Sequence, residues 1–440
     1  MKLSDKNLKI LTHVARLLLG LTFVFSGFVK AIDPLGSTYK IEDYLDAFGW
    51  VYFKDFSFLM SVLLSATEFF LGIALLIGVY KHSISLMLFL FMIFLTPLTL
   101  YIAIANPVTD CGCFGDALVL SNTATFIKNL VLLVLAFFVY FNNDKFITFF
   151  GRHTSRYTAF WCALFPLLLS TWSYRHLPLI DFLPYKVGNN LPSLMKAPAG
   201  APTDSITTIF IYEKNGKQKK FTLDKAPFAD TTWKFVDRED IAVRQGYRSP
   251  IHDFVLELPE QGDITNKVLT DHSYTFLFVS NKLEDMNYNH LQEILDVKSY
   301  ANQHGYRFLA LTNSSPRGIE DWKYEYDDAM TFCSLDDRTL KTMIRSNPGL
   351  ILIKDGTVYQ KWGFRDVPVF AGEKRPLEKT PYGTIGYPAI GRLLGGLLFV
   401  LTVPLIFFFL LHSGYRFRYN KHSLKWFKFE KIADKDSHNK

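Results

Sequence analysis

Two cysteines separated by a single glycine are the residues of this sequence best suited to chemistry. Cys111 and Cys113 flank Gly112 in the stretch TDCGCFGD, and the other cysteines of the 440-residue chain are Cys162 and Cys333. In an oxidising compartment, two adjacent thiols form a disulfide at least part of the time. Closing a ring across one residue is sterically demanding, and strain makes a disulfide easier to reduce. The spacing therefore predicts a redox-active pair, with a structural disulfide that never exchanges as the alternative.

The residues around this pair narrow the chemistry. A glycine between the cysteines permits the tight turn that such a ring needs. The two thiolates lack neighbouring His or Cys residues to complete a tetrahedral set, so we predict no metal site. Cys162 falls in an apolar stretch and Cys333 on an expected strand, so each is expected to be a small buried residue. A resolving role for Cys333 toward the pair is the alternative.

Two lysines lie where positive charge is unusual. Lys30 ends the first apolar stretch, and Lys128 lies about one and a half helical turns inside the fourth, both toward the end of the helices at which the Cys-Gly-Cys loop (106–121) is expected. A cation near the loop would lower the pKa of a thiol and favour the thiolate, or hold an anionic group. Alternatively, both side chains extend to the membrane surface.

Glu68 lies near the middle of the second apolar stretch, where a carboxylate is costly and normally faces protein. Counting about 1.5 Å per residue places Arg16 within one turn of the same depth. We therefore expect Arg16 and Glu68 to pair. The pair would be either a polar contact that stabilises the helices or part of a proton or quinone site.

The elements that carry these residues are apolar helices. Hydrophobic residues make up 49% of the chain, which includes 41 Phe and 22 Tyr, more than a soluble chain usually has. About six stretches are long enough to cross a bilayer core of about 30 Å. They are residues 9–31, 57–79, 83–105, 122–142, 157–178 and 387–412.

The distribution of Lys and Arg predicts the orientation of these helices. Basic residues gather at the N-terminus, in the loops after the second and fourth stretches, and in the C-terminal tail. Positive residues stay on the cytoplasmic side, so both termini are expected there. The Cys-Gly-Cys loop, which has no Lys or Arg, and residues 179–386 would then be periplasmic. Because the basic residues lie beside apolar stretches, we expect them to meet lipid headgroups and not nucleic acid.

The long insert between the last two stretches shows strand and helix patterns. Residues around Asn215-Gly216 alternate apolar and polar side chains about a turn dipeptide, which predicts a hairpin. From Ser273 onward strands alternate with helices, and Pro348 precedes a final hairpin. Over roughly 251–365 this order resembles the thioredoxin fold, with Pro348 at the cis-proline position. Residues 280–287, where thioredoxins carry Cys-x-x-Cys, have no cysteine, so this domain cannot exchange dithiols by itself.

The membrane half carries a more specific resemblance. The stretch ARLLLGLTFVFSGFVKAIDP, a glutamate in the second span and CGCFGD after the third are similar to the MauE/DoxX family of small four-helix membrane proteins. The resemblance covers about 1–145. It implies a role in the maturation or redox chemistry of exported proteins, because MauE is associated with disulfide formation in methylamine dehydrogenase and DoxX with thiosulfate oxidation coupled to quinone.

Together these observations predict an integral membrane α-helical bundle with a periplasmic α/β thioredoxin-like domain and a small β-rich subdomain, in a multi-pass protein of the bacterial inner membrane. Its expected function is thiol/disulfide maturation of exported clients by Cys111 and Cys113, linked to a quinone, with a client bound beside Pro348. A non-enzymatic scaffold that binds an exported partner is the alternative. The expected parts are 1–145 (four-helix domain), 146–180 (fifth spanning helix), 181–262 (β-rich subdomain), 263–386 (thioredoxin-like domain), 387–412 (sixth spanning helix) and 413–440 (basic cytoplasmic tail).

Overall fold

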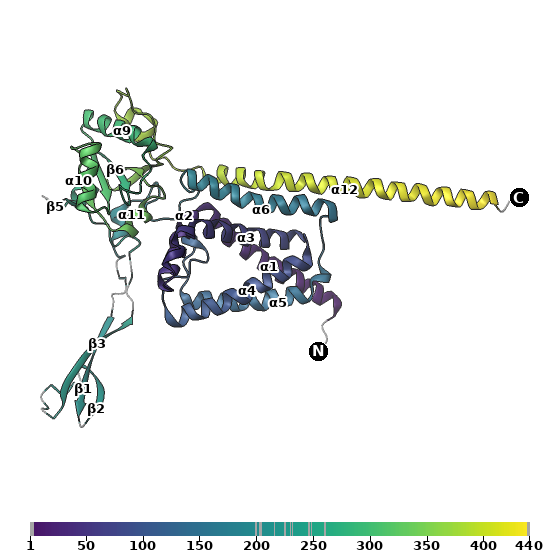
Figure 1. Cartoon of the computed structure of the whole chain (residues 1–440), viewed down its shortest axis with the longest axis horizontal. Helices are drawn as coiled ribbons and strands as arrows, with labels where there is room; N and C mark the ends of the chain where they lie inside the picture. Colours follow the sequence, from purple (N-terminus) through teal and green to yellow (C-terminus); the bar gives the residue numbers. More distant parts are fainter. Residues whose placement is uncertain are drawn as a thin grey trace.

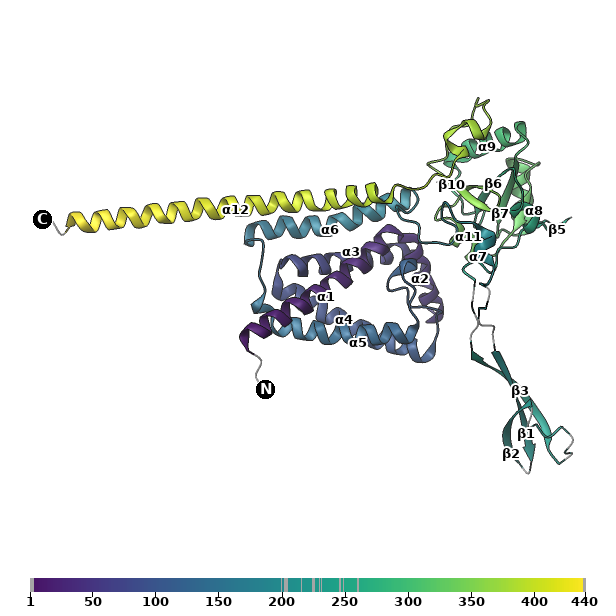
Figure 2. The same cartoon turned by 180° about the vertical axis from the view of Figure 1, so that it is seen from behind.

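The structure is a computed structural model that combines a helical domain, an α/β domain and a projecting three-stranded sheet (Figure 1). It describes residues 4–198, 200–201, 205–214, 216–223, 226–228, 230, 232–244, 247, 249–258 and 261–437. Asn215 of the expected hairpin turn lies outside the described residues. A long C-terminal helix, α12 (Ile390–Ser437), runs along the helical domain and extends beyond it (Figures 1 and 2).

The helical domain is built from long apolar helices that run roughly antiparallel. They are α1 (Asp5–Ile32), α3 (Ser57–Ile77), α4 (Lys81–Ala105), α5 (Asn122–Phe141) and α6 (Arg152–Arg175). Within the described residues, five segments are long and apolar enough to cross a membrane: 5–32, 51–77, 81–105, 122–141 and 390–414. These segments make the chain a multi-pass membrane protein, and they agree with five of the six predicted stretches.

The sixth predicted span, 157–178, is the exception. It forms α6, which is not among the five segments because Ser, Thr, Tyr and basic residues lower its mean hydropathy. Nevertheless, α6 lies alongside α12 (Figure 1), and Phe165 of α6 packs on Phe69 of α3 with ring centroids 5.4 Å apart. The helix is therefore covered on two sides by the apolar helices, which reduces its need for a fully apolar surface.

Small residues bring α1 and α3 into close contact. A Cβ atom on Gly27 would lie 2.3 Å from the backbone nitrogen of Phe69, and one on Gly72 would lie 2.6 Å from that of Val24. Only glycine permits this approach, which is typical of helix pairs in membranes. The two glycine contacts determine which residues of α1 and α3 face each other.

A short helix, α2 (Pro34–Ala47), and a 3-10 helix (Val51–Phe56) connect α1 to α3. The Asp33 side chain caps α2 by accepting from the Gly36 N–H, and Pro34 occupies the first turn, where its missing N–H is not needed. Trp50 and Tyr52 after α2 are exposed, as are Trp172 and Tyr174 near the end of α6. Exposed aromatic residues at helix ends are typical of a membrane interface.

The α/β domain contains a seven-stranded sheet in the order β10-β9-β6-β7-β8-β4-β5. Strands β6, β7 and β8 are parallel, and β9 pairs antiparallel with β6. The strands are β4 (Glu257–Leu258), β5 (Gly262–Asp263), β6 (Tyr274–Ser280), β7 (Arg307–Thr312), β8 (Phe332–Ser334), β9 (Gly349–Lys354) and β10 (Thr357–Gly363). The helices are α7 (Leu191–Met195), α8 (Thr265–Leu269), α9 (Leu291–Gln303), α10 (Pro316–Glu325) and α11 (Asp337–Met343).

The inner strand β6 is buried on both faces. Phe276 and Phe278 pack in one core with α9 and α10, whereas Leu277 and Val279 pack in a second core with α8 and α11. Alternating side chains of one strand therefore fill two layers. The third part of the chain is an antiparallel sheet in the order β2-β1-β3, formed by β1 (Ser205–Lys214), β2 (Lys217–Thr222) and β3 (Lys234–Arg244), which projects from the α/β domain (Figure 2).

The expected pair of Arg16 and Glu68 does not form. Arg16 instead donates to backbone carbonyls at the end of α3, from Nε to Leu75 at 2.8 Å and from Nη2 to Leu76 at 2.6 Å, and from Nη1 to Ile147 at 3.2 Å. The estimate of depth counted from the helix ends, but the glycine contacts place α1 and α3 in a different register. Arg16 therefore satisfies the free carbonyls that every helix leaves at its C-terminus.

We expect Arg16→Met to lower the free energy of unfolding by about 2–3 kcal/mol, because three carbonyls lose a charged donor. Thermal unfolding of the purified protein in detergent measures this. Lys9→Met, an exposed lysine of the same helix, is the control. Equal unfolding midpoints for the two variants would contradict the capping role.

Candidate functional site

The Cys-Gly-Cys loop folds as a tight turn that brings the two thiols into contact. Gly112 adopts a φ of 64°, its N–H donates to Asp110 Oδ1 at 3.0 Å, and its carbonyl accepts from Gly115 N at 3.0 Å. The Sγ atoms of Cys111 and Cys113 are 3.0 Å apart, and neither is in a disulfide. A disulfide bond measures about 2.05 Å, so oxidation needs an approach of about 1 Å.

Gly112 is favoured at its position for two reasons. Its positive φ strains any residue with a side chain. In addition, a Cβ atom there would lie 3.1 Å from Cγ of Lys40 on α2. The sequence-based expectation that glycine permits the turn therefore agrees with the backbone geometry.

A buried ion pair supports the loop from inside the helical domain. Lys30 Nζ lies 2.7 Å from both carboxylate oxygens of Glu68. The Ser26 hydroxyl lies 2.8 Å from Glu68 Oε2 and 2.6 Å from the Cys113 carbonyl oxygen, so it can donate to either. Ser26, Lys30 and Glu68 are each less than 10% exposed. Lys30, and not the expected Arg16, is thus the residue that neutralises Glu68. Through Ser26, this ion pair is connected to the backbone carbonyl of Cys113.

The second lysine approaches the loop from α5. Lys128 Nζ lies 4.3 Å from the centre of the Phe114 ring, next to Cys113. Lys128, Glu68 and Cys113 also line a cavity of about 30 Å³. That volume holds about one water molecule and is far below the size of typical ligand pockets. The expected quinone therefore finds no preformed pocket in this cavity.

These surroundings give the two thiols different acidities. The pKa of Cys113 is lowered to about 6, because the Cys111 thiol donates to it and because Lys128 and Lys30 stabilise the thiolate against the effect of burial. The pKa of Cys111 is raised, because it donates to Cys113 and because it is buried. Cys113 is therefore the thiol that is ionised at neutral pH.

The interfacial helix α2 holds the loop from the other side. Lys40 Nζ forms an ion pair with Asp110 Oδ2 at 2.6 Å, and Tyr44 Oη donates to the Cys111 carbonyl at 2.9 Å. No helix was predicted between the apolar stretches 9–31 and 57–79, so α2 was missed. The available signal was Asp33-Pro34, an N-cap residue followed by proline at the first helical position.

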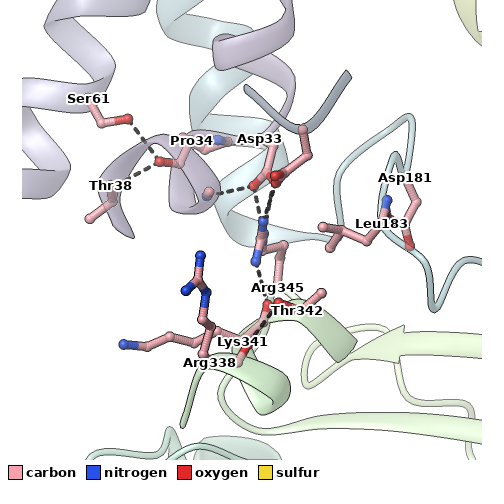
Figure 3. Close-up of polar contacts among 12 residues, drawn as sticks. Asp33, Pro34, Thr38, Ser61, Asp181, Leu183, Arg338, Lys341, Thr342 and Arg345 are labelled. Atoms are coloured by element: carbon pink, nitrogen blue, oxygen red, sulfur yellow. Dashed lines mark hydrogen bonds and ion pairs between the residues drawn. The ribbon is translucent and has the colours of Figure 1, made fainter. Parts of the chain in front are cut away.

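Arg345 connects the α/β domain to this site. The residue follows α11, and its guanidinium contacts Asp33 at 2.9 Å (Figure 3). It also contacts Asp116 at 2.7 Å. Arg345 is 6% exposed. Nothing in the local sequence pattern indicated this contact, because its partners are 312 and 229 residues away along the chain.

Pro348, the expected peptide-binding residue, follows Arg345 by three positions and is buried. The Asn347–Pro348 peptide bond is cis, as expected for its position. The Asn347 carbonyl accepts from the N–H of Asn287 at 3.0 Å. The main-chain acceptor next to Pro348 is therefore already used within the α/β domain. The described residues contain no group of three or more His, Cys, Asp or Glu side chains that could hold a metal ion.

Comparison with known families supports the assignment of the helical domain. Residues 8–142 match the family model described as methylamine utilisation protein MauE, which spans α1 to α5 and includes the Cys-Gly-Cys loop. The helical domain is MauE-like. Residues 206–245, which cover the projecting sheet, match a domain of unknown function (DUF8463). No curated protein and no solved structure shows a significant match to the chain.

We expect alkylation of reduced Cys113 by iodoacetamide to increase through about pH 6 and to level off above it, because the thiolate is populated above its pKa. For an ordinary cysteine thiol, the midpoint of the alkylation curve would lie near pH 8.5. Lys128→Met should move the midpoint upward by about one unit, because a stabilising cation is lost.

Mass spectrometry of the Cys113 peptide measures this curve. The control is Lys54→Met, which removes a partly exposed lysine that pairs with Asp46. A midpoint near pH 8.5 in the unmodified protein would contradict the assignment of Cys113 as the thiolate.

We expect Lys30→Met and Glu68→Leu each to destabilise the protein by about 3–5 kcal/mol, because each leaves a buried charge without its partner. The double variant should regain more than half of the lost stability. Chemical unfolding in detergent micelles provides the comparison. Strictly additive losses in the double variant would rule out the ion pair.

Proposed function

We propose that this protein is a thiol–disulfide oxidoreductase of the cell envelope that introduces disulfides into exported proteins. The observation that carries the proposal is the contact of two thiols at 3.0 Å, with Cys113 facing two lysines and Cys111 hydrogen-bonded to it. A structural disulfide that never exchanges needs no ionised thiol. An exchanging disulfide needs a good leaving group, and a thiol of low pKa leaves faster.

The exchange begins with the oxidised pair. A client thiolate attacks the sulfur of Cys111, the Cys111–Cys113 bond breaks, and Cys113 leaves as a thiolate stabilised by Lys128 and Lys30. A second client thiolate then attacks the client sulfur of this mixed disulfide, which forms the client disulfide and releases Cys111. Two electrons and two protons pass from the client to the cysteine pair. A lipid-soluble quinone, which becomes a quinol, is the proposed acceptor that reoxidises the pair.

The proposal places the Cys-Gly-Cys loop on the periplasmic side of the inner membrane, with both termini in the cytoplasm. Its support is the absence of Lys and Arg from residues 106–121 and their abundance at the opposite helix ends. Because Arg345 contacts Asp116 within one molecule, the α/β domain lies on the same side as the loop. An oxidising compartment would then surround the thiols.

The α/β domain is proposed to be a thioredoxin-like domain without a dithiol. Its support is the parallel order of β6, β7 and β8 and the antiparallel hairpin of β9 and β10. Residues 280–287 contain no cysteine, and Cys333 is fully buried. The domain would therefore recognise a client and leave the thiol chemistry to the helical domain.

The alternative is a non-enzymatic scaffold in which the cysteines only pin the loop. The burial of Arg345 between Asp33 and Asp116 favours this reading, because it fixes the α/β domain to the helical domain. A scaffold needs this rigidity and makes no use of the two thiols.

We expect the purified, oxidised protein to remove about two thiols per molecule from a reduced dithiol peptide without any added oxidant, which follows from the stoichiometry of exchange. The double variant Cys111→Ser, Cys113→Ser should remove none, whereas Cys333→Ser should act like the unmodified protein. Free thiols are counted by a colorimetric reagent after the protein is removed.

Full activity of the double variant would eliminate the oxidoreductase and leave the scaffold. The sidedness is tested separately on cells whose outer membrane has been opened: a membrane-impermeant phosphine first reduces the cysteine pair, and a membrane-impermeant maleimide then labels the free thiols. Labelling of Cys113 before lysis supports the periplasmic location, and labelling only after lysis refutes it.

A further inference from the structure

A polar cleft lies between the helical domain and the α/β domain, directly beside the thiol pair. Its volume is about 440 Å³, within the range of ligand sites. One wall is α2, with Tyr39 and Asp43, and the other is α11, with Arg338 and Thr342. The Cys-Gly-Cys loop contributes Asp110, which precedes Cys111, and Asp116, which follows Cys113 by three positions.

The width of this cleft is held by contacts at its edge. Arg345 joins Asp33 and Asp116, and its guanidinium lies 5.5 Å from the centre of the Tyr39 ring. Lys341 Nζ lies 4.6 Å from the same ring. Figure 3 shows Arg338 and Arg345 extending from the α11 segment on the side that faces the helical domain. The two walls therefore come from different domains and are held in one arrangement.

Ion pairs neutralise part of the charge in the cleft. Lys40 is paired with Asp110, and Lys341 with Asp337. Arg338 is exposed, and its contact is Thr109 Oγ1 at 3.4 Å; in the part of the chain that the structure describes, it has no carboxylate partner. On the opposite wall, Asp43 likewise has no ion pair among the described residues. Hydrogen-bond donors on one wall thus face acceptors on the other.

The charge of the residues that line the cleft favours a polypeptide over a phosphate headgroup as the bound ligand. The cleft is lined by five acidic side chains (Glu42, Asp43, Asp110, Asp116, Asp337) and four basic ones (Lys40, Arg338, Lys341, Arg345). A phosphate headgroup would meet a slight excess of negative charge. A polypeptide main chain offers carbonyls to Arg338 and N–H groups to Asp43, and a basic side chain would add to the attraction.

We propose that this cleft, and not the chain around Pro348, binds an extended client segment of neutral or basic character so that its cysteine reaches Cys111. This inference rests on the proposed thiol exchange. The cleft adjoins the thiol pair on both flanks, whereas Pro348 is buried and the carbonyl of Asn347 is already bonded to Asn287. The occupant is a polypeptide, because one main chain offers carbonyls to Arg338 and N–H groups to Asp43.

The experiment uses the full-length, oxidised protein in detergent and two reduced dithiol peptides of equal length, one basic and one acidic. Single-turnover rates against peptide concentration yield a half-saturating concentration. Arg338→Ala should raise this value for the basic peptide about tenfold, because a charged donor to the main chain is lost. Thr342→Trp, which fills the cleft, should raise it further. The unmodified protein should prefer the basic peptide over the acidic one.

The matched control is Arg317→Ala, which removes an exposed arginine at the same position of α10, the second residue of the helix. Dithiothreitol, which is too small to contact both walls, reports the thiol chemistry alone. No oxidation of either peptide or of dithiothreitol by the unmodified protein refutes the proposed function itself.

Normal exchange with unchanged half-saturation in Arg338→Ala and Thr342→Trp overturns only the cleft. The same assay is repeated in bilayer discs of phosphatidylcholine and of phosphatidylglycerol. A half-saturating concentration that follows the lipid composition and not the charge of the peptide assigns the cleft to a headgroup and also overturns the inference.

Discussion

The buried ion pair between Lys30 and Glu68 is the interaction on which the site depends. A carboxylate inside a membrane helix must be neutralised, and the required cation here comes from the adjacent helix. The close approach of α1 to α3 at Gly27 makes the pair possible, and Ser26 extends it to the carbonyl of Cys113. Lys30, which neutralises Glu68 in the helical domain, therefore also favours the thiolate of Cys113, whereas the negative charge of Glu68 opposes it.

The thiol pair is held from three directions, and each direction has a different physical basis. The helical domain supplies buried charge, α2 supplies the hydrogen bond from Tyr44 and the ion pair of Lys40, and the α/β domain supplies Arg345. A loop held in this way loses little conformational entropy when its cysteines react. Gly112 adopts the positive φ of the turn in which both sulfur atoms are in contact.

The sequence predicted the elements better than their contacts. Hydropathy located the helices of the MauE-like domain, and the alternation of strands and helices located the sheet, because both signals are local. The partner of Glu68 was predicted wrongly, because the register of α1 and α3 depends on glycine contacts and not on distance from the helix ends. Arg345 and Asp116 could not be paired in advance, because no pattern links residues 229 positions apart.

If the proposed function holds, the helical domain and the α/β domain have different tasks, because reoxidation of the thiols takes place at the lipid and client binding takes place in water. A quinone is confined to the lipid, so the thiols that it reoxidises must lie at the membrane surface, where the Cys-Gly-Cys loop lies at the end of the apolar helices. An unfolded client is polar and hydrated, so its binding surface must face water. Arg345 holds the α/β domain against the helical domain through Asp33 and Asp116. A client bound to α11 would therefore lie at a fixed distance from the Cys-Gly-Cys loop. A domain with its own Cys-x-x-Cys would compete with that loop for the client, which gives a physical reason for the absence of cysteine from residues 280–287.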